Sequence, residues 1–284
     1  MTIRELHPVG RTYLDLATRL LQDARITDAE DGIWEAADVQ WWWRVDRHPD
    51  PESQSFWLDD GMPVVASVFT KWNGWLGCDL LGTSAAIEAN SDVLWRHVES
   101  RFRDRDVSMM IRDGDEERAR AAKRHGFVAT QDVTLIAWMD VGQRPKPSEL
   151  RPGTRIQSYA GGRHPVGRRS GPEVARRLAE CSLYRSDLDL AILDSDEVVG
   201  YALFWADPLT RVGLLEPMRI EESHQGRGLS KALIAEGLDR LAAAGCTRLK
   251  VMFDPSNEPA RRLYIGAGYV PKATARTWTR SPGT

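Results

Sequence analysis

The chain has 284 residues, of which 42% are hydrophobic and 28% are charged, a composition that suits one large or two ordinary globular domains. This composition excludes a disordered chain, and no apolar run approaches the roughly 18 residues that a membrane helix needs. We therefore expect no membrane association. Glu5 and Asp15 stand where a secretory signal would be apolar, which predicts a cytoplasmic protein.

The net charge of −3 conceals two halves of opposite sign. Residues 1–142 carry 16 basic and 25 acidic side chains, whereas residues 143–284 carry 22 basic and 16 acidic ones. A basic half suits an anionic ligand and an acidic half is compatible with a cationic one, although both also fit an ordinary solvated surface. No basic cluster is dense enough to indicate nucleic acid, and no cysteine spacing indicates a metal site.

A polar stretch with two prolines divides the chain almost in half. We interpret residues 143–150 as a linker between a domain over 1–142 and a domain over 151–284. The halves also repeat, because DGDEERARAAKRHGFV and PSNEPARRLYIGAGYV lie 142 residues apart. Each copy predicts a short helix capped by Asp or Asn, then a glycine, then an aromatic residue that begins a strand.

The first half is expected to follow the order of the second half after an additional N-terminal helical part. In the second half, hydrophobic periodicity and turn residues predict three helices and five strands. The helices are expected at 172–181, 226–243 and 257–266, and the strands at 188–193, 197–205, 212–220, 247–253 and 269–279. This alternation predicts two α/β domains, each with a mixed sheet flanked by helices.

Residues 216–230 form the most informative segment, because a strand ends there, a glycine-containing loop follows and a long helix begins. Backbone N–H groups at a helix N-terminus bind phosphate oxygens, and glycine lets the backbone approach them closely. Arg227 adds a positive charge, while His224 is expected to be a solvated loop residue. The same pattern also fits an ordinary tight turn between a strand and a helix.

This segment resembles the pyrophosphate loop of the GNAT acetyltransferase superfamily, whose pattern is Gln or Arg, two residues, Gly, one residue, then Gly or Ala. Gln225, Gly228 and Ser230 occupy these positions, and the serine is a departure small enough to preserve close packing. The family's second signature is matched by Asn257, Ala260, Leu263, Tyr264, Gly268 and Tyr269. The resemblance covers residues 151–284 and continues in degenerate form over 1–142. It implies two tandem GNAT-like domains, each with a mixed, mostly antiparallel sheet.

The resemblance implies acetyl-CoA as the acyl donor and no metal. In GNAT proteins the two strands beside the donor splay apart, and the donor contacts the main chain of the exposed strand, here at Met218 and Ile220. Asn257 would either contact the pantetheine arm or only cap its helix. The residues expected to contact the donor are Met218, Arg219, Ile220, Gln225, Gly226, Arg227, Gly228, Leu229, Ser230, Asn257 and Ala260.

The expected acceptor is a primary amine of a small molecule. An alkyl amine with a pKa near 10.4 must lose its proton first, which costs about 4.6 kcal/mol at pH 7, so a general base is needed. Glu216 is the candidate base, since its position two residues before Met218 predicts that both share one strand face. It also fits a structural salt bridge or substrate binding. Tyr264 is the candidate acid for the departing thiolate, or else a core aromatic residue.

The N-terminal half is expected to keep the fold without binding CoA productively, because residues 82–87 lack the phosphate loop and Ala122 aligns with Tyr264. Trp41, Trp42 and Trp43 cannot all point inward on one helix, so at least one should lie at an interface between domains or facing a ligand. In the second half the candidate acceptor contacts are Tyr184, Tyr201 and Trp205, which core packing explains equally well.

Two other functions remain open on the sequence. One is a protein acetyltransferase that modifies lysine or an N-terminus, and the other is a CoA-binding sensor or scaffold without catalysis. The presence of Tyr264, Glu216 and the loop glycines favours an enzyme.

Overall fold

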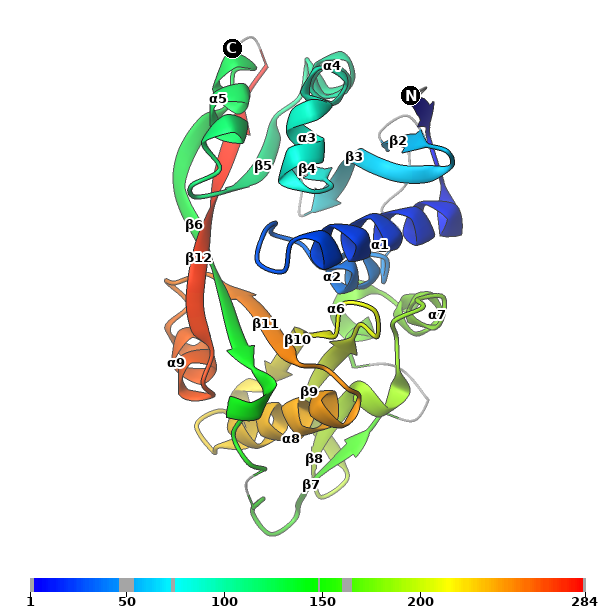
Figure 1. Ribbon diagram of the computed structural model, residues 1–284. Helices are drawn as coiled ribbons and strands as arrows, with labels where there is room; N and C mark the ends of the chain where they lie inside the picture. The colour runs from blue at the N-terminus through cyan, green and yellow to red at the C-terminus, as the bar shows by residue number, and fades with distance from the viewer. Residues whose placement is uncertain (1–2, 46–53, 73–74, 148, 160–164, 283–284) are drawn as a thin grey trace. The chain divides into compact units, whose positions relative to one another are not determined.

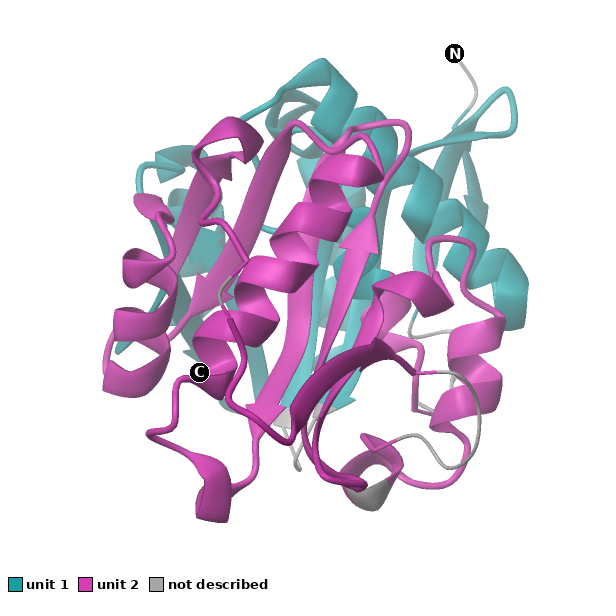
Figure 2. Cartoon of the chain, turned by 90° about the horizontal axis from the view of Figure 1, so that it is seen from below, with its two compact units in different colours: residues 1–39, 46–134, 273–284 teal, residues 40–45, 135–272 magenta. Residues whose placement is uncertain are grey.

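The computed structural model describes residues 3–45, 54–72, 75–147, 149–159 and 165–282 (Figure 1). The chain contains two compact units, coloured separately in Figure 2. Unit 1 comprises residues 1–39, 46–134 and 273–284, and unit 2 comprises residues 40–45 and 135–272. These units differ from a division at residue 142, because residues 40–45 and 135–142 belong to unit 2 and residues 273–284 belong to unit 1. Within the described ranges, no helix is long and apolar enough to cross a membrane.

Unit 1 contains a sheet whose strands follow the order β1-β2-β3-β4-β5-β12. Neighbouring strands are antiparallel except for the parallel pair β4 and β5. Its strands are β1 (Arg4–Leu6), β2 (Ser55–Asp59), β3 (Met62–Trp72), β4 (Trp75–Leu81), β5 (Val107–Arg112) and the later part of β12 (Val270–Arg280). Its helices are α1 (Gly10–Thr27), α3 (Ser84–Ala89), α4 (Ser91–Phe102), α5 (Glu116–Arg124) and the first part of α2 (Ala36–Trp42).

Unit 2 repeats this arrangement with the order β6-β11-β10-β9-β8-β7, in which β10 and β11 are the parallel pair. Its strands are β7 (Thr154–Ser158), β8 (Asp189–Asp194), β9 (Glu197–Ala206), β10 (Val212–Ile220), β11 (Arg248–Phe253) and the later part of β6 (Val128–Asp140). Its α-helices are α6 (Gly167–Ser170), α7 (Val174–Ala179), α8 (Leu229–Ala243) and α9 (Glu258–Gly266). Short 3₁₀ turns are η2 (Val141–Gln143), η3 (Ser186–Leu188) and η4 (Glu222–His224). The predicted α/β class with mixed, mostly antiparallel sheets is confirmed.

Strands β6 and β12 each begin in one unit and end in the other. Strand β6 follows α5, and its residues 135–140 pair with β11 of unit 2. Strand β12 follows α9, and its residues 275–280 pair with β5 of unit 1. Each half of the chain therefore supplies the last strand of the other half's sheet.

The predicted repeat corresponds to two equivalent helix–strand junctions. Asp115 caps α5 by accepting a hydrogen bond from Arg118 N, and Asn257 caps α9 by accepting one from Ala260 N. The glycines that end these helices, Gly126 and Gly268, have φ of 79° and 103°. Glycine is favoured at such left-handed positions, which explains its recurrence at the same place in both copies.

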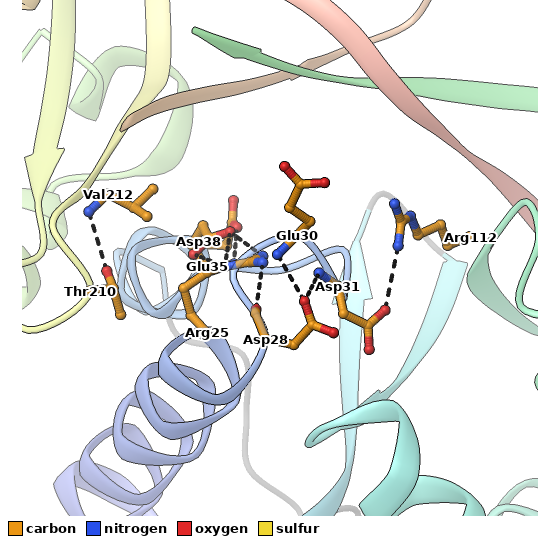
Figure 3. A network of polar contacts seen from close by, with 9 residues as sticks. All are labelled: Arg25, Asp28, Glu30, Asp31, Glu35, Asp38, Arg112, Thr210 and Val212. Atoms are coloured by element: carbon orange, nitrogen blue, oxygen red, sulfur yellow. Dashed lines mark hydrogen bonds and ion pairs between the residues drawn. The ribbon is translucent and has the colours of Figure 1, made fainter. Parts of the chain in front are cut away.

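A buried ion pair fixes the turn that follows α1 in unit 1 (Figure 3). Arg25 donates from Nε to both carboxylate oxygens of Glu35 at 3.1 Å and from Nη2 at 2.6 Å, while Asp38 accepts from Glu35 N at 2.7 Å. Arg25 and Glu35 are 5% and 3% exposed. A fork-shaped guanidinium bound to a carboxylate in this way fixes the orientation of both side chains.

Helix α8 packs its apolar stripe on the sheet of unit 2. Leu233, Leu238 and Leu241 are fully buried, as their spacing predicts. The helix begins at Leu229 rather than at residue 226, because Gly226 and Gly228 have φ of 73° and 81°. At Gly237 the helix lies so close to β9 that an added Cβ would stand 2.0 Å from Phe204 Cζ.

We expect Gly237→Ala to lower the free energy of unfolding by about 1–3 kcal/mol, because the ring of Phe204 would have to move within a packed core. Gly266→Ala in α9 is the matched control, since its Cβ would meet nothing within 4 Å. Urea denaturation of both variants measures the difference. Equal transition midpoints would contradict the close packing of α8 on β9.

Candidate functional site

The site of unit 2 begins where the parallel strands β10 and β11 separate. They pair from Val212 with Arg248 to Leu214 with Lys250, whereas β10 continues to Ile220 and β11 to Phe253. Over the described residues no further pairing joins these two strands. Ligands of α/β proteins bind at the carboxyl ends of parallel strands where the sheet opens in this way.

A β-bulge in β10 lies beside this opening. Leu215 pairs with Phe204 and Met218 with Ala202, so Glu216 and Pro217 together oppose Leu203 alone. Leu215 and Met218 both pack with the α8 core, which shows that the regular alternation of faces is interrupted between them. The shared face predicted for Glu216 and Met218 requires unbroken alternation and does not hold across this bulge. Trp205 Nε1 donates to the backbone oxygen of Glu216 at 2.8 Å.

The loop between β10 and α8 is held by its own polar side chains. Gln225 Nε2 donates to Ile220 O at 3.1 Å, and Arg227 Nη2 donates to Ser223 O at 2.8 Å. Asp194 at the end of β8 lies 3.5 Å from His224 Nε2 and 3.8 Å from Arg227 Nη1. These contacts orient the glycine-rich turn before the N-terminus of α8, whose dipole favours an anion.

His224 differs from its expected place as a solvated residue, since its side chain is 15% exposed and faces Asp194. The sequence does not predict the contact of Asp194 with this loop. It lies thirty residues earlier in the chain, on a strand that only the folded sheet brings near. No local pattern in the sequence signals this contact.

A cavity of about 450 Å³ lies between the end of β10, the loop, the start of α8 and helix α9. Nine of the eleven predicted donor contacts line it, together with Tyr264, whereas Arg227 and Gly228 lie in the adjoining loop outside the lining. Sequence reasoning omitted His224, Pro259 and Leu263. The full lining is Met218, Arg219, Ile220, His224, Gln225, Gly226, Leu229, Ser230, Asn257, Pro259, Ala260, Leu263 and Tyr264.

Tyr264 lies on α9, with its ring 5.3 Å from that of Phe253 and 6.1 Å from that of Tyr269. Burial, and then the nearby negative charge of Glu216, raise the pKa of Tyr264 to about 12. The phenol is therefore neutral at pH 7 and able to donate a proton. The charge of Glu216 therefore acts on Tyr264, while Glu216 itself is not among the residues that line the cavity.

The three candidate acceptor contacts are not among the residues that line this cavity. Ala202 and Phe204 lie on the face of β9 that packs against α8, and Tyr201 and Trp205 lie on the opposite face. The side chains of Tyr201 and Trp205 are almost completely buried. Tyr184 is partly buried and meets Trp205 edge to face at 6.5 Å. Its hydroxyl donates to Asp189 at 2.8 Å. Burial and the charge of Asp189 raise the pKa of Tyr184 above its ordinary value.

The parallel strands of unit 1 also separate, but different charged side chains surround their opening. Strands β4 and β5 pair only at Leu76 and Gly77 over the described residues, and a cavity of about 870 Å³ lies nearby. Seven carboxylates and three guanidinium groups line that cavity. Ser84, the first residue of α3, already donates its N–H and hydroxyl to the carboxylate of Asp31, which also contacts Arg112 at 3.5 Å (Figure 3).

The tryptophan run is divided between packing environments. Trp41 is 4% exposed and carries the guanidinium of Arg44 at 3.7 Å from its ring centroid. Trp43 donates from Nε1 to Glu180 at 2.7 Å, and the guanidinium of Arg177 covers its ring. Trp43 thus packs within unit 2. In the parts of the chain that are described, no group of histidine, cysteine and carboxylate side chains could hold a metal ion.

Comparison with known proteins identifies the class to which this geometry belongs. Residues 164–269 match the family model described as "Acetyltransferase (GNAT) family". A mycothiol acetyltransferase from Nocardioides sp. (strain ATCC BAA-499 / JS614) is 24% identical over 293 residues, covering 90% of this chain and 94% of that protein. The uncharacterized N-acetyltransferase YhbS of Escherichia coli is 31% identical over 96 residues, covering 32% of this chain and 53% of that protein.

Solved structures match the whole chain. A tandem GNAT protein from the clavulanic acid biosynthesis pathway has a TM-score of 0.67 at 11% identity, covering 100% of this chain and 99% of its own. A GCN5-related N-acetyltransferase from Sphaerobacter thermophilus has a TM-score of 0.60 at 17% identity, covering 99% and 97%. Residues 164–269 therefore match the GNAT acetyltransferase family, and the whole chain shares the fold of tandem GNAT proteins. Proteins of this family transfer an acyl group and use acetyl-CoA as a co-substrate.

We expect Glu216→Gln to lower the pKa of Tyr264 from about 12, because the substitution removes a negative charge that disfavours the tyrosinate. NMR titration of ring-labelled tyrosine measures the change, with Tyr264→Phe used to assign the signal. Glu236→Gln on α8 is the control, since Glu236 pairs with Arg240 instead. A Tyr264 titration that is identical in the Glu216 variant and the wild type would show that the two groups do not interact.

Proposed function

We propose that the chain is an acetyl-CoA-dependent N-acetyltransferase that acetylates a primary amine of a small molecule, with its donor site in unit 2. The observation that carries the proposal is the cavity of unit 2, where the end of β10, a glycine-rich loop and Tyr264 come together. The charge of Glu216 acts on Tyr264 from outside this lining. The name of the Nocardioides relative supports a small-molecule acceptor.

The residues around this cavity suit the parts of the donor. Backbone N–H groups from Gly226 to Ser230, at the positive end of the α8 dipole, would hold the diphosphate. The main chain of β10 at Met218 and Ile220 would contact the pantetheine arm, because β11 has left this part of the strand. Asn257 caps α9 and also lines the cavity, so the two roles considered for it are compatible.

The proposed reaction is direct transfer between two bound substrates. Glu216 accepts a proton from the acceptor ammonium, directly or through water, and the neutral nitrogen attacks the thioester carbonyl. Backbone N–H groups of β10 stabilise the negative charge that develops on the carbonyl oxygen. The carbon–sulfur bond then breaks and the new amide bond remains. The departing thiolate takes a proton from the Tyr264 hydroxyl, and the nitrogen, which is positively charged after its attack, gives up its second proton through water to restore the Tyr264 phenol.

Unit 1 has lost the features that hold an acyl donor. The carboxylate of Asp31 takes the N–H and hydroxyl of Ser84, and hydrogen bonds from these groups lower the pKa of that carboxyl despite its burial. The excess of carboxylates around the nearby cavity repels the phosphates of CoA. We therefore infer one donor site in each chain.

Isothermal titration calorimetry with acetyl-CoA is the first test, and the expected stoichiometry is one per chain. Gly228→Asp should abolish this binding, because it places a negative charge and a side chain in the loop at a left-handed position. Gly245→Asp is the matched control, a left-handed glycine at the far end of α8 with equally open surroundings. Two sites per chain would overturn the assignment to unit 2 alone, and retained binding in the Gly228 variant would overturn the loop assignment.

Tyr264→Phe should lower kcat by about 100-fold, the usual contribution of a general acid, and leave the affinity for acetyl-CoA nearly unchanged. Tyr269→Phe is the control, because the neighbouring Tyr269 hydroxyl is buried within the core. Steady-state turnover with a panel of small amines and with lysine peptides measures both variants. Preferred turnover of peptides would favour a protein acetyltransferase, and CoA binding without any turnover would favour a sensor.

A further inference from the structure

A segment of the first half of the chain is built into unit 2. Residues 40–45, from the end of α2 onward, pack with unit 2 beside the loop that follows α7. Trp43 Nε1 donates to Glu180, and Arg177 Nε donates to Trp43 O at 2.6 Å. These two hydrogen bonds hold the segment against helix α7 and the residue that follows it.

Gln40 makes a second and different set of contacts. Its side chain is completely buried, its Oε1 accepts from Leu183 N at 2.8 Å, and its Nε2 donates to Ser182 Oγ at 2.7 Å. Cys181 Sγ donates to the backbone oxygen of Gln40 at 3.4 Å. The side-chain amide of Gln40 therefore hydrogen-bonds to two consecutive residues, Ser182 and Leu183, because a carboxamide both donates and accepts hydrogen bonds.

The residues that Gln40 contacts are connected through Tyr184 and Trp205 to the backbone of Glu216. Leu183 precedes Tyr184, whose hydroxyl is bonded to the buried Asp189 and whose ring meets Trp205 edge to face. Trp205 in turn donates to the backbone oxygen of Glu216 within the bulge. A short series of direct contacts thus joins Gln40 to the backbone that carries the proposed general base.

We propose that Gln40 is a positioning residue for the acceptor side of the active site in unit 2. It fixes residues 182–184, so that Tyr184 supports Trp205 and Trp205 holds Glu216 in its place. The inference rests on the proposed acetyltransferase function. It assigns to the first half of the chain a part in catalysis by the second, through one buried amide.

The donor side of the site does not depend on this series of contacts. The loop before α8 is held by Gln225, Arg227, His224 and Asp194, none of which is among the contacts of Gln40 described above. Loss of the Gln40 amide should therefore change acceptor use without changing donor affinity. A general loss of folding would change both.

The test uses Gln40→Leu in the full-length chain, which keeps the bulk of the side chain and removes the amide. The N–H of Leu183 then lacks its buried hydrogen-bonding partner. We expect kcat/KM for the amine substrate to fall about tenfold, with a raised KM for that amine. The Kd for acetyl-CoA should stay at the wild-type value. Hydrogen exchange of the Leu183 amide should become faster, and this measurement does not require the amine substrate to be known.

Trp43→Phe is the matched control, since it removes the bond to Glu180 and keeps the ring that Arg177 covers. It should leave the acceptor KM unchanged. If Gln40→Leu does not fold, Ser182→Ala removes one of the two hydrogen bonds without altering α2, and a rise of about threefold in acceptor KM is expected.

The outcomes separate the two proposals. A wild-type protein that binds acetyl-CoA and acetylates no amine refutes the proposed function, while the exchange rate of Leu183 still tests whether Gln40 orders residues 182–184. With an active wild type, an unchanged kcat/KM for the amine in Gln40→Leu overturns the positioning role. The same result follows if Trp43→Phe raises the acceptor KM equally, or if Leu183 exchange stays at the wild-type rate.

Discussion

The separation of β10 from β11 after Leu214 is the constraint on which the site depends. A strand that leaves its neighbour exposes N–H and C=O groups that need other hydrogen-bonding partners. An extended amide-containing arm such as pantetheine can supply them, which is why an opening in the sheet can serve as a binding site. The bulge at Glu216 and Pro217 lies at this opening, and the charge of the Glu216 carboxylate raises the pKa of Tyr264.

The two units share one arrangement of strands and differ in the segment that follows their first parallel strand. Both have parallel strands that separate after a few residues and a capped helix before a left-handed glycine. They differ in the segment after the first of those strands. Unit 2 has a loop with Gly226 and Gly228 before a long helix, whereas unit 1 begins α3 at once, with Ser84 bound to Asp31. The two units therefore have the same strand arrangement and different charged groups around its opening.

Local patterns in the sequence predicted much of unit 2 and most of the residues that line its cavity. Strand 212–220 has the predicted bounds, and Asn257 caps its helix, because alternation, glycine and capping residues act over a few positions. The bulge in β10 could not be predicted, since it depends on the register with β9. The same is true of Asp194 beside the loop and of Gln40 beside Leu183, whose partners lie 30 and 143 residues away in sequence.

The exchange of β6 and β12 between the sheets has a consequence for how the chain is made. The sheet of unit 1 includes β12, which is translated after every strand of unit 2. The half that is synthesised first must therefore wait, with the edge of β5 uncovered, until the strands of unit 2 have emerged from the ribosome. Unit 2 receives its exchanged strand, β6, before the rest of its own strands are made. The order in which the two units are completed thus runs against the order in which they are encoded.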